Sequence, residues 1–93
     1  MYVILVYDIS TDDDGARVSR NVFKICKKYL SHFQKSVFRG DITPSKLISL
    51  RSELKSIIVE NEDFVCILKS ISPDVFGEET LGNPTPNGEN IFL

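Results

Sequence analysis

Six consecutive apolar or aromatic residues at positions 2–7 run directly into a single carboxylate, Asp8. β-Branched and aromatic side chains in such a run predict a buried β-strand, because they fill a pleated surface that is covered on both faces. Asp8 then lies at the end of a core strand. A charge at that position needs an ion pair, hydrogen bonds or a metal ion, since burying it unpaired is costly. Residues 11–15 are polar and acidic, which indicates that a loop begins directly after the strand.

The length and composition of the chain indicate one small globular domain. The chain has 93 residues, of which 42% are hydrophobic, and this fraction is too high for a disordered protein. No apolar run approaches the roughly 20 residues that span a bilayer, and the N-terminal run lacks the basic region and cleavage site of a signal peptide. Cys26 and Cys66 lie in apolar segments, which favours core thiols over a disulfide. We therefore expect a cytoplasmic protein that makes no membrane contact.

The charged residues are distributed unevenly along the chain. Residues 16–51 contain nine basic residues and one acidic residue, so this segment carries +8 although the net charge of the whole chain is −2. Such asymmetry is typical of a basic face that binds a polyanion, and also of a solvated helix surface, so both interpretations stay open. The candidate nucleic-acid-binding residues of this segment are Arg17, Arg20, Lys24, Lys27, Lys28, Lys35 and Arg39.

Apolar periodicity and turn signals divide the chain into five elements. These are a strand at 2–8, a helix at 15–30, an extended segment at 33–38, a helix at 44–58 and a strand at 64–68. Asp14 is a candidate N-cap of the first helix, and Thr43 followed by Pro44 is a typical start for the second. Gly40 and Asp41 either turn the extended segment or bend it into a short third strand, and the sequence does not decide between the two.

With the extended segment split into two strands, the element order becomes βαββαβ. This order predicts the ferredoxin-like α+β fold, an antiparallel sheet with two helices on one face. The other face then needs cover, which a second copy of the chain would supply. Alternation along the first strand places Asp8 on one face with Ile4 and Val6, and places Leu5 and Tyr7 on the other.

Residues 73–93 form a tail whose composition differs from that of the domain formed by residues 1–72. The tail contains three of the four prolines and ends in Ile91, Phe92 and Leu93. Apolar residues at the end of a polar tail often add a strand to the sheet of another protein. We therefore expect the C-terminal strand to pair with a partner subunit, with a frayed terminus as the alternative.

Asp8 is the strongest candidate for a catalytic or metal-binding residue. Mg²⁺ is usually held by one or two carboxylates together with waters and phosphate oxygens of the substrate. A twofold dimer supplies a second Asp8, and the two side chains together would hold one Mg²⁺ or Mn²⁺ that polarises a phosphodiester and activates a water. The alternative is that Asp8 only accepts backbone N–H hydrogen bonds in the loop after the strand.

Other catalytic patterns fit the residues less well. The haloacid-dehalogenase nucleophile motif needs a second aspartate where Ser10 stands, and no glycine-rich phosphate loop occurs. We expect His32, the single histidine, to contact solvent or phosphate rather than act as a base. The aromatic consensus of the RNA-recognition motif is absent, so we expect Phe33 and Phe38 to lie in the core.

Three stretches, together with a fourth match, carry a family resemblance. Residues 6–10 (VYDIS) end the first strand, Arg17 and Arg20 open the helix that follows, and residues 34–40 (QKSVFRG) are the most specific stretch. Residues 62–65 (EDFV), which open the last strand, add to the match. Over about residues 1–70 the chain resembles the family of CRISPR-associated protein two. This resemblance implies a ferredoxin-like homodimer whose C-terminal strand crosses to the partner subunit. It also implies a scaffold that holds duplex DNA and the CRISPR integrase during spacer acquisition.

The resemblance also implies roles for individual residues. Some family members are reported as metal-dependent ribonucleases or deoxyribonucleases, and by position the catalytic residues would be Asp8, which holds the metal, and its neighbour Tyr7. Arg17 and Arg20, which open the first helix, would contact phosphates. The residues that would shape the site are Ser10, Ser36 and Phe38. One departure is His32, which stands where the family often has an arginine, and a largely neutral histidine would bind phosphate less strongly.

Three functions are therefore considered. The first is a dimeric scaffold that binds duplex DNA and the integrase. The second is a stand-alone Mg²⁺-dependent endonuclease acting on DNA or single-stranded RNA, which would require Asp8 whereas the scaffold would not. The third, from another class, is a ferredoxin-like domain that regulates by binding a small ligand and has no affinity for nucleic acid.

Overall fold

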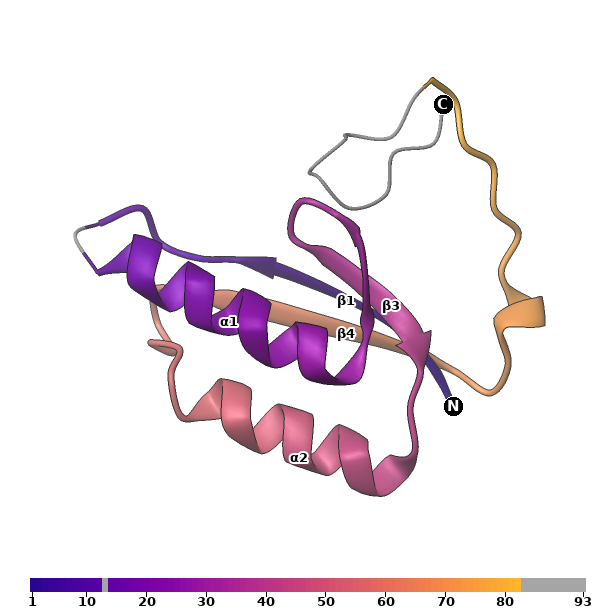
Figure 1. Cartoon of the computed structure of the whole chain (residues 1–93), viewed down its shortest axis with the longest axis horizontal. Coiled ribbons are helices and arrows are strands. Elements are labelled where there is room, and N and C mark those ends of the chain that lie inside the picture. Colours follow the sequence, from indigo (N-terminus) through magenta and orange to yellow (C-terminus); the bar gives the residue numbers. More distant parts are fainter. Residues whose placement is uncertain (13, 83–93) are drawn as a thin grey trace.

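Two helices cover one face of a four-stranded antiparallel sheet in this computed structural model, which describes residues 1–12 and 14–82 (Figure 1). The elements in chain order are β1 (Tyr2–Asp8), α1 (Gly15–Tyr29), β2 (Ser31–Gln34), β3 (Val37–Asp41), α2 (Pro44–Lys55), β4 (Phe64–Ser70) and a short 3₁₀ helix, η1 (Pro73–Val75). The strands lie in the order β2-β3-β1-β4, and all neighbouring pairs are antiparallel. The predicted ferredoxin-like α+β fold is thereby confirmed.

β1 is central in the sheet, because it pairs with β3 on one side and with β4 on the other. Val3, Leu5 and Tyr7 belong to the core under the helices and are no more than 6% exposed. Ile4 and Val6 are half-buried on the opposite face of the sheet, which we call the open face. The alternation predicted for this strand is therefore confirmed.

The core lies between the sheet and the helices. Phe38 of β3 is its largest fully buried side chain, and it packs in one cluster with Cys26 of α1 and Leu50 of α2. Burying an apolar side chain of this kind contributes about 1.5–3 kcal/mol to stability. Cys26 is a core thiol, as predicted, whereas Cys66 is half-buried opposite Val6 on the open face, so the two free thiols lie on opposite sides of the sheet.

A tight turn at Lys35 and Ser36 divides the segment 33–38, so the expectation of one extended stretch there is wrong. β2 and β3 form a hairpin around this turn, and Lys35 adopts a left-handed φ of 41°. Nε2 of His32 lies 2.8 Å from the carbonyl oxygen of Lys35 and supports the turn. Gly40 lies within β3 at a φ of 152°, a value that L side chains rarely adopt. A third strand is therefore present, as one alternative required, but it covers Val37–Asp41 and follows a turn at 35–36 rather than a bend at Gly40 and Asp41.

Phe33 lies on the open face, contrary to the prediction that it joins the core. His32, directly before it, contacts the rings of Phe23 and Phe38 on the core side, and successive strand residues point to opposite faces. The guanidinium carbon of Arg39 lies 4.0 Å from the centre of the Phe33 ring. Phe38, in contrast, is fully buried, as expected.

The helices begin where the sequence predicts, but their caps and ends differ in detail. The hydroxyl of Thr43 accepts a hydrogen bond from the N–H of Lys46 at 3.2 Å, and Pro44 is the first residue of α2. Asp14 precedes α1, but its carboxylate makes no capping hydrogen bond. α2 ends at Lys55, earlier than the predicted 58. In the part of the chain that the structure describes, neither helix has the length and hydropathy needed to cross a bilayer.

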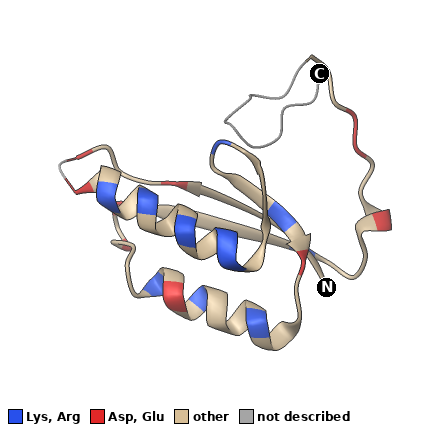
Figure 2. Ribbon diagram, in the orientation of Figure 1, with Lys and Arg blue, Asp and Glu red and all other residues tan. Residues whose placement is uncertain are grey.

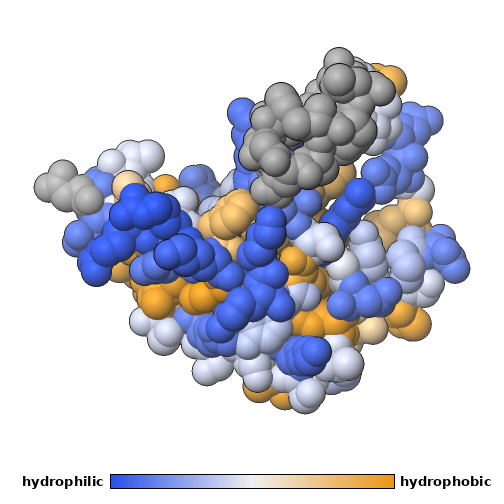
Figure 3. Space-filling view, in the orientation of Figure 1, coloured by the Kyte–Doolittle hydropathy of each residue, from blue (hydrophilic) through white to orange (hydrophobic). Residues whose placement is uncertain are grey.

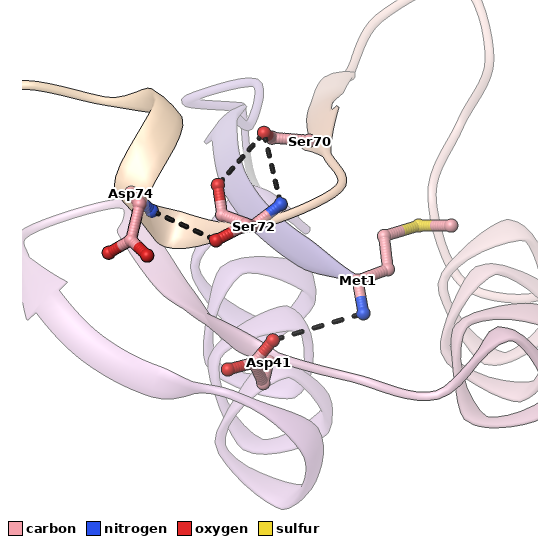
Figure 4. Close-up of polar contacts among 5 residues, drawn as sticks. All are labelled: Met1, Asp41, Ser70, Ser72 and Asp74. Atoms are coloured by element: carbon pink, nitrogen blue, oxygen red, sulfur yellow. Dashed lines mark hydrogen bonds and ion pairs between the residues drawn. The ribbon is translucent and has the colours of Figure 1, made fainter.

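The chain leaves the sheet after β4 through a serine-rich turn (Figure 4). Oγ of Ser70 donates to the carbonyl oxygen of Ser72 at 3.0 Å, and Oγ of Ser72 accepts from the N–H of Asp74 at 3.2 Å. Close by, the N-terminal ammonium of Met1 lies 3.8 Å from Oδ1 of Asp41 at the end of β3. The apolar C-terminal end at 91–93, predicted to form a strand with a partner, lies outside the described residues.

Candidate functional site

Asp8 is the last residue of β1, and its side chain is exposed on the open face. Its backbone pairs with Phe64 of β4. Within residues 1–12 and 14–82 its carboxylate accepts no hydrogen bond and forms no ion pair. In this described part of the chain, therefore, Asp8 does not cap the loop that follows it, and its oxygens face solvent.

Two hydrogen bonds fix the backbone on either side of Asp8. The N–H of Tyr7 donates to the carbonyl oxygen of Ser36 at 3.1 Å, which ties β1 to the hairpin turn. The N–H of Ser10 donates to Oδ1 of Asp63 at 2.9 Å. The structure thus brings the main chain of Ser10 and Ser36 beside Asp8, and Oγ of Ser10 also accepts a hydrogen bond from the N–H of Asp12 at 3.3 Å.

Asp63 is a residue of this site that the sequence analysis missed. Its second oxygen, Oδ2, accepts a hydrogen bond from the N–H of Val59 at 2.8 Å. One carboxylate therefore joins the loop after β1 to the turn before β4. An aspartate that ends a polar turn directly before a strand commonly binds neighbouring backbone N–H groups, and this signal is readable in the sequence at 60–63.

The start of α1 approaches the same loop very closely. A Cβ atom at Gly15 would lie 1.8 Å from the carbonyl oxygen of Ser10, so only glycine fits at this position without a shift of the backbone. The N–H of Gly15 also donates to the carbonyl oxygen of Asp12 at 2.9 Å. The basic helix therefore begins directly beside the loop that follows Asp8.

Tyr7 lies on the other face of the sheet from Asp8, because successive strand residues point to opposite faces. Tyr7 is 6% exposed, and its ring centroid lies 6.3 Å from that of Phe38. Burial is the main cause of the raised pKa of Tyr7, and the thiol of Cys26 raises it further, so the phenol stays protonated at neutral pH. The structure therefore does not bring Tyr7 and the Asp8 carboxylate together, and Phe38 supports the site from the core.

A hollow of about 200 Å³ beside this loop is lined by several acidic side chains, among them Asp12, Asp14, Glu62 and Asp63. The pKa of Glu62 is raised, first by a hydrogen bond with the Asp12 carboxyl group and then by the negative charge of Asp12. Among residues 1–12 and 14–82, no three His, Cys, Asp or Glu side chains are grouped to hold a metal ion. Within the described residues, Asp8 therefore stands as a single carboxylate on the open face.

Five of the predicted nucleic-acid-binding residues lie on α1 (Figure 2). They are Arg17, Arg20, Lys24, Lys27 and Lys28, all of them exposed, and we call them the basic face of α1. Their spacing of three or four residues places most of them in one row along the helix. Arg17 lies 3.6 Å from Asp14, and Nζ of Lys28 lies 2.5 Å from Oε1 of Glu53 on α2. Lys28 is therefore already paired with an acidic side chain of the same chain.

The other two predicted residues lie away from α1. Lys35 is exposed at the hairpin turn. Arg39 lies on the open face, where its guanidinium covers the Phe33 ring and its Nη1 atom lies 2.5 Å from Oε1 of Glu78. The structure thus does not bring Arg39 to the basic face of α1, since Arg39 and the buried Phe38 are successive residues of one strand.

A second group of cations surrounds a groove between α2 and the edge strand β4. Arg51, Lys55 and Lys69 line this groove of about 320 Å³, together with apolar side chains such as Leu54 and Ile67. In space-filling view, hydrophilic side chains spread over the helices with hydrophobic surface between them (Figure 3). Lys55 and Lys69 lie outside the segment whose charge the sequence analysis emphasised.

Comparison of the sequence with known proteins finds one matching family and similar relatives. The family model described as CRISPR associated protein Cas2 matches residues 1–76 of the chain. The CRISPR-associated endoribonuclease Cas2 of Fusobacterium nucleatum subsp. nucleatum is 42% identical over 92 residues, which cover 99% of this chain and 87% of that protein. The CRISPR-associated endoribonuclease Cas2 of Thermotoga maritima is 40% identical over 93 residues, which cover 100% of this chain and 99% of that protein.

Solved structures are similar over nearly the same length. The crystal structure of Streptococcus pyogenes Cas2 at pH 6.5 matches with a TM-score of 0.78 at 31% identity, covering 88% of this chain and 100% of that chain. A second structure, described as a crystal structure of cas2, matches with a TM-score of 0.78 at 33% identity, covering 99% of this chain and 98% of that chain.

Proposed function

Because the chain belongs to the Cas2 family of CRISPR-associated proteins, we propose that it acts in spacer acquisition as a cytoplasmic homodimeric scaffold that binds duplex DNA and the CRISPR integrase. The observation that carries the proposal is the placement of two different surfaces on opposite sides of one sheet. The basic face of α1 lies on the helix side, and apolar side chains are exposed on the open face. The first surface suits a polyanion, and the second suits another copy of the chain.

The open face supports the homodimer. Phe64 and Leu68 of β4 are 59% and 51% exposed, and both lie on the same side of the sheet as Ile4 and Asp8. Exposed apolar side chains that lie together mark interaction sites more often than isolated ones do. A second copy packed there about a twofold axis would bring a second Asp8 to the facing surface. The tail would extend this contact by adding its C-terminal strand to the partner subunit.

Duplex DNA is proposed to lie along the basic face of α1. Arg20 and Lys24 are exposed near the middle of this helix and would contact phosphates. Contacts between cations and phosphates release counterions, so the affinity is independent of base sequence and falls steeply as salt increases. Lys28 would contribute less than its neighbours, because it is already paired with Glu53.

Asp8 is the residue that would hold a divalent cation. Its carboxylate is a hard oxygen donor, exposed and without a partner in the described protomer, which suits Mg²⁺ or Mn²⁺. One protomer offers a single carboxylate, so the fit is complete only with the Asp8 of a second copy. The ion, when bound, would polarise a phosphodiester and activate a water. The backbone hydrogen bonds of Tyr7 and Ser10, on either side of Asp8, would orient its carboxylate toward the ion.

Duplex affinity measured against salt concentration tests the scaffold. We expect the affinity of the unmodified protein to fall steeply between about 50 and 200 mM salt. In the variant Arg20→Gln/Lys24→Gln, the slope of log K against log salt should shrink by about 0.9 for each phosphate that the variant no longer neutralises. Lys55→Gln on α2 is the matched control and should keep the full slope. An affinity that does not respond to salt, or an equal change of slope in the control, would show that DNA binds elsewhere.

A second candidate function is metal-dependent cleavage of RNA or DNA, which the exposed Asp8 carboxylate favours. The relatives in Fusobacterium nucleatum and Thermotoga maritima are both named endoribonucleases. Asp8→Asn should abolish Mg²⁺-dependent cleavage while leaving duplex binding intact, because the substitution removes a metal ligand and leaves α1 unchanged. Equal activity of the variant and the unmodified protein would point to a contaminating nuclease.

A further inference from the structure

Glu53 is the single acidic residue of the two helices. α1 carries the five cations of its basic face and no acidic residue, and α2 carries Lys46, Arg51 and Lys55 besides Glu53. Figure 2 shows the acidic position of α2 in red among blue positions of the same helix. The helix layer that covers the sheet is therefore basic except at this one position.

Both oxygens of the Glu53 carboxylate are bound by the end of α1. Oε1 lies 2.5 Å from Nζ of Lys28, and Oε2 accepts a hydrogen bond from the hydroxyl of Tyr29. Nζ of Lys28 also lies 5.6 Å from the centre of the Tyr29 ring. Two adjacent residues of α1 thus hold the carboxylate from two directions and fix it beside the last turn of that helix.

The carboxylate of Glu53 is ionised at neutral pH. Its pKa is lowered, first by the hydrogen bond from Lys28 and then by the hydrogen bond from Tyr29. The side chain is 34% exposed, so its charge acts on anions that approach from solvent. A phosphate that took Lys28 from Glu53 would leave the carboxylate without its cation and would be repelled by it. Glu53 therefore opposes phosphate binding at Lys28.

Glu53 also separates the cations of the two helices. Its side chain reaches toward α1, whereas those of Arg51 and Lys55 line the groove between α2 and β4. This arrangement follows from the helix geometry, because residues two positions apart do not share a face. A duplex that shifted from α1 toward the groove would pass over the Glu53 carboxylate.

We propose that Glu53 confines duplex DNA to the part of the basic face of α1 that precedes Lys28, by engaging Lys28 and by placing a negative charge between α1 and the cations of α2. The proposal rests on the proposed binding of duplex DNA to α1 and adds the residue that limits its extent. Glu53 touches no phosphate and acts through Lys28. Without its charge, the last turn of α1 joins the DNA-binding surface.

The salt dependence of duplex affinity tests this role. In Glu53→Gln, the slope of log K against log salt should steepen by about 0.9, because Lys28 then neutralises one more phosphate. The variant should accordingly lose about three- to fourfold more affinity than the unmodified protein between about 50 and 200 mM salt. Glu60→Gln removes the same charge in the exposed turn before β4 and should leave the slope unchanged. A Glu53→Gln slope equal to that of the unmodified protein, or an equal increase in Glu60→Gln, overturns the proposal.

Lys28→Gln gives a second, independent measurement. Alone it should leave the slope unchanged, because Lys28 neutralises no phosphate while Glu53 engages it. Combined with Glu53→Gln it should abolish the increase. Lys28 is exposed, so its substitution leaves the core intact. If Lys28→Gln alone flattens the slope by about 0.9, Lys28 binds phosphate in the presence of Glu53 and the proposal is overturned.

Failure of the proposed duplex site gives a different pattern of slopes. If Arg20→Gln/Lys24→Gln keeps the full slope, duplex DNA does not lie on α1, and both proposals fall. If that variant has a smaller slope while Glu53→Gln has the slope of the unmodified protein, the duplex site stands and only the role of Glu53 is overturned.

Discussion

The backbone N–H of Ser10 donates a hydrogen bond to Oδ1 of Asp63, which lies 53 positions later in the chain and 2.9 Å away in space. The other oxygen of the same carboxylate accepts a hydrogen bond from Val59. One side chain thereby connects the loop after β1 to the turn that leads into β4. The position of the loop beside Asp8 therefore depends on a distant residue as well as on its own sequence.

Asp63→Ala should destabilise the fold by about 1–3 kcal/mol, because two backbone N–H groups lose their acceptor. Asp63→Asn keeps one carbonyl oxygen and should lose less. Urea denaturation would measure both. Glu60→Ala, an exposed acidic residue of the same turn, is the matched control and should stay within about 0.5 kcal/mol of the unmodified protein. If Asp63→Ala proves as stable as this control, the two hydrogen bonds do not hold the loop.

Gly15→Ala tests the close approach of α1 to the loop after β1. Alanine is ordinarily better than glycine in a helix by about 1 kcal/mol. Here the added Cβ would meet the carbonyl oxygen of Ser10, so we expect a net loss of about 1–3 kcal/mol in thermal or urea unfolding. Ala16→Gly, the reverse change at the next and exposed position, should lose only the propensity difference. A stabilised Gly15→Ala protein would show that the contact is not tight.

Glu53 should make stability depend on pH in the acidic range. Its pKa is lowered, first by the hydrogen bond from Lys28 and then by the hydrogen bond from Tyr29. A carboxyl group whose pKa is lower in the folded state stabilises the fold above its unfolded-state pKa, and this contribution is lost as pH falls through the lower folded-state value. The urea midpoint should therefore drop below about pH 4.5, the ordinary value for this group.

Glu53→Gln should show a smaller drop over the same pH range, because glutamine does not titrate. Urea midpoints measured from neutral pH downward in both proteins give the comparison. Identical pH profiles would mean that the contact between α1 and α2 is too mobile to shift the titration of Glu53.

Phe64→Ser should weaken the proposed homodimer about tenfold or more, because it removes a large aromatic anchor from the open face. The unfolding free energy of the monomer should change little, since the ring is 59% exposed. Ile48→Ser replaces a side chain that is 61% exposed on α2, away from the open face, and serves as the control. Equal effects of the two substitutions on dimerisation, measured by sedimentation equilibrium, would argue against an interface at Phe64.

The alternation of β1 could be predicted because it depends only on local chain geometry. Asp8 lies on the open face and Leu5 in the core, as period-two spacing requires. The same geometry separates Tyr7 from Asp8, although the family resemblance groups them as neighbours. Adjacent positions in a strand are close in sequence but point to opposite faces.

The hairpin turn could not be predicted from local signals. Lys35 and Ser36 include none of the glycine, asparagine or aspartate residues that usually accept a left-handed conformation. The turn instead depends on pairing between β2 and β3 and on the contact of His32 with the Lys35 carbonyl. Pairs that only the tertiary fold brings together, such as Arg39 and Glu78, could not be predicted for the same reason.

The central place of β1 has a consequence for how long the site persists. Strands paired on both sides open mainly when the whole domain unfolds, whereas surface loops open locally and often. β1 pairs with β3 from Tyr2 to Val6 and with β4 from Tyr2 to Asp8. Asp8, in contrast, ends the strand and pairs with Phe64 of β4 alone, so its backbone can open with the strand end while residues 2–6 stay closed. An ion or phosphate held by this carboxylate would therefore have a shorter-lived anchor than the centre of the same strand provides.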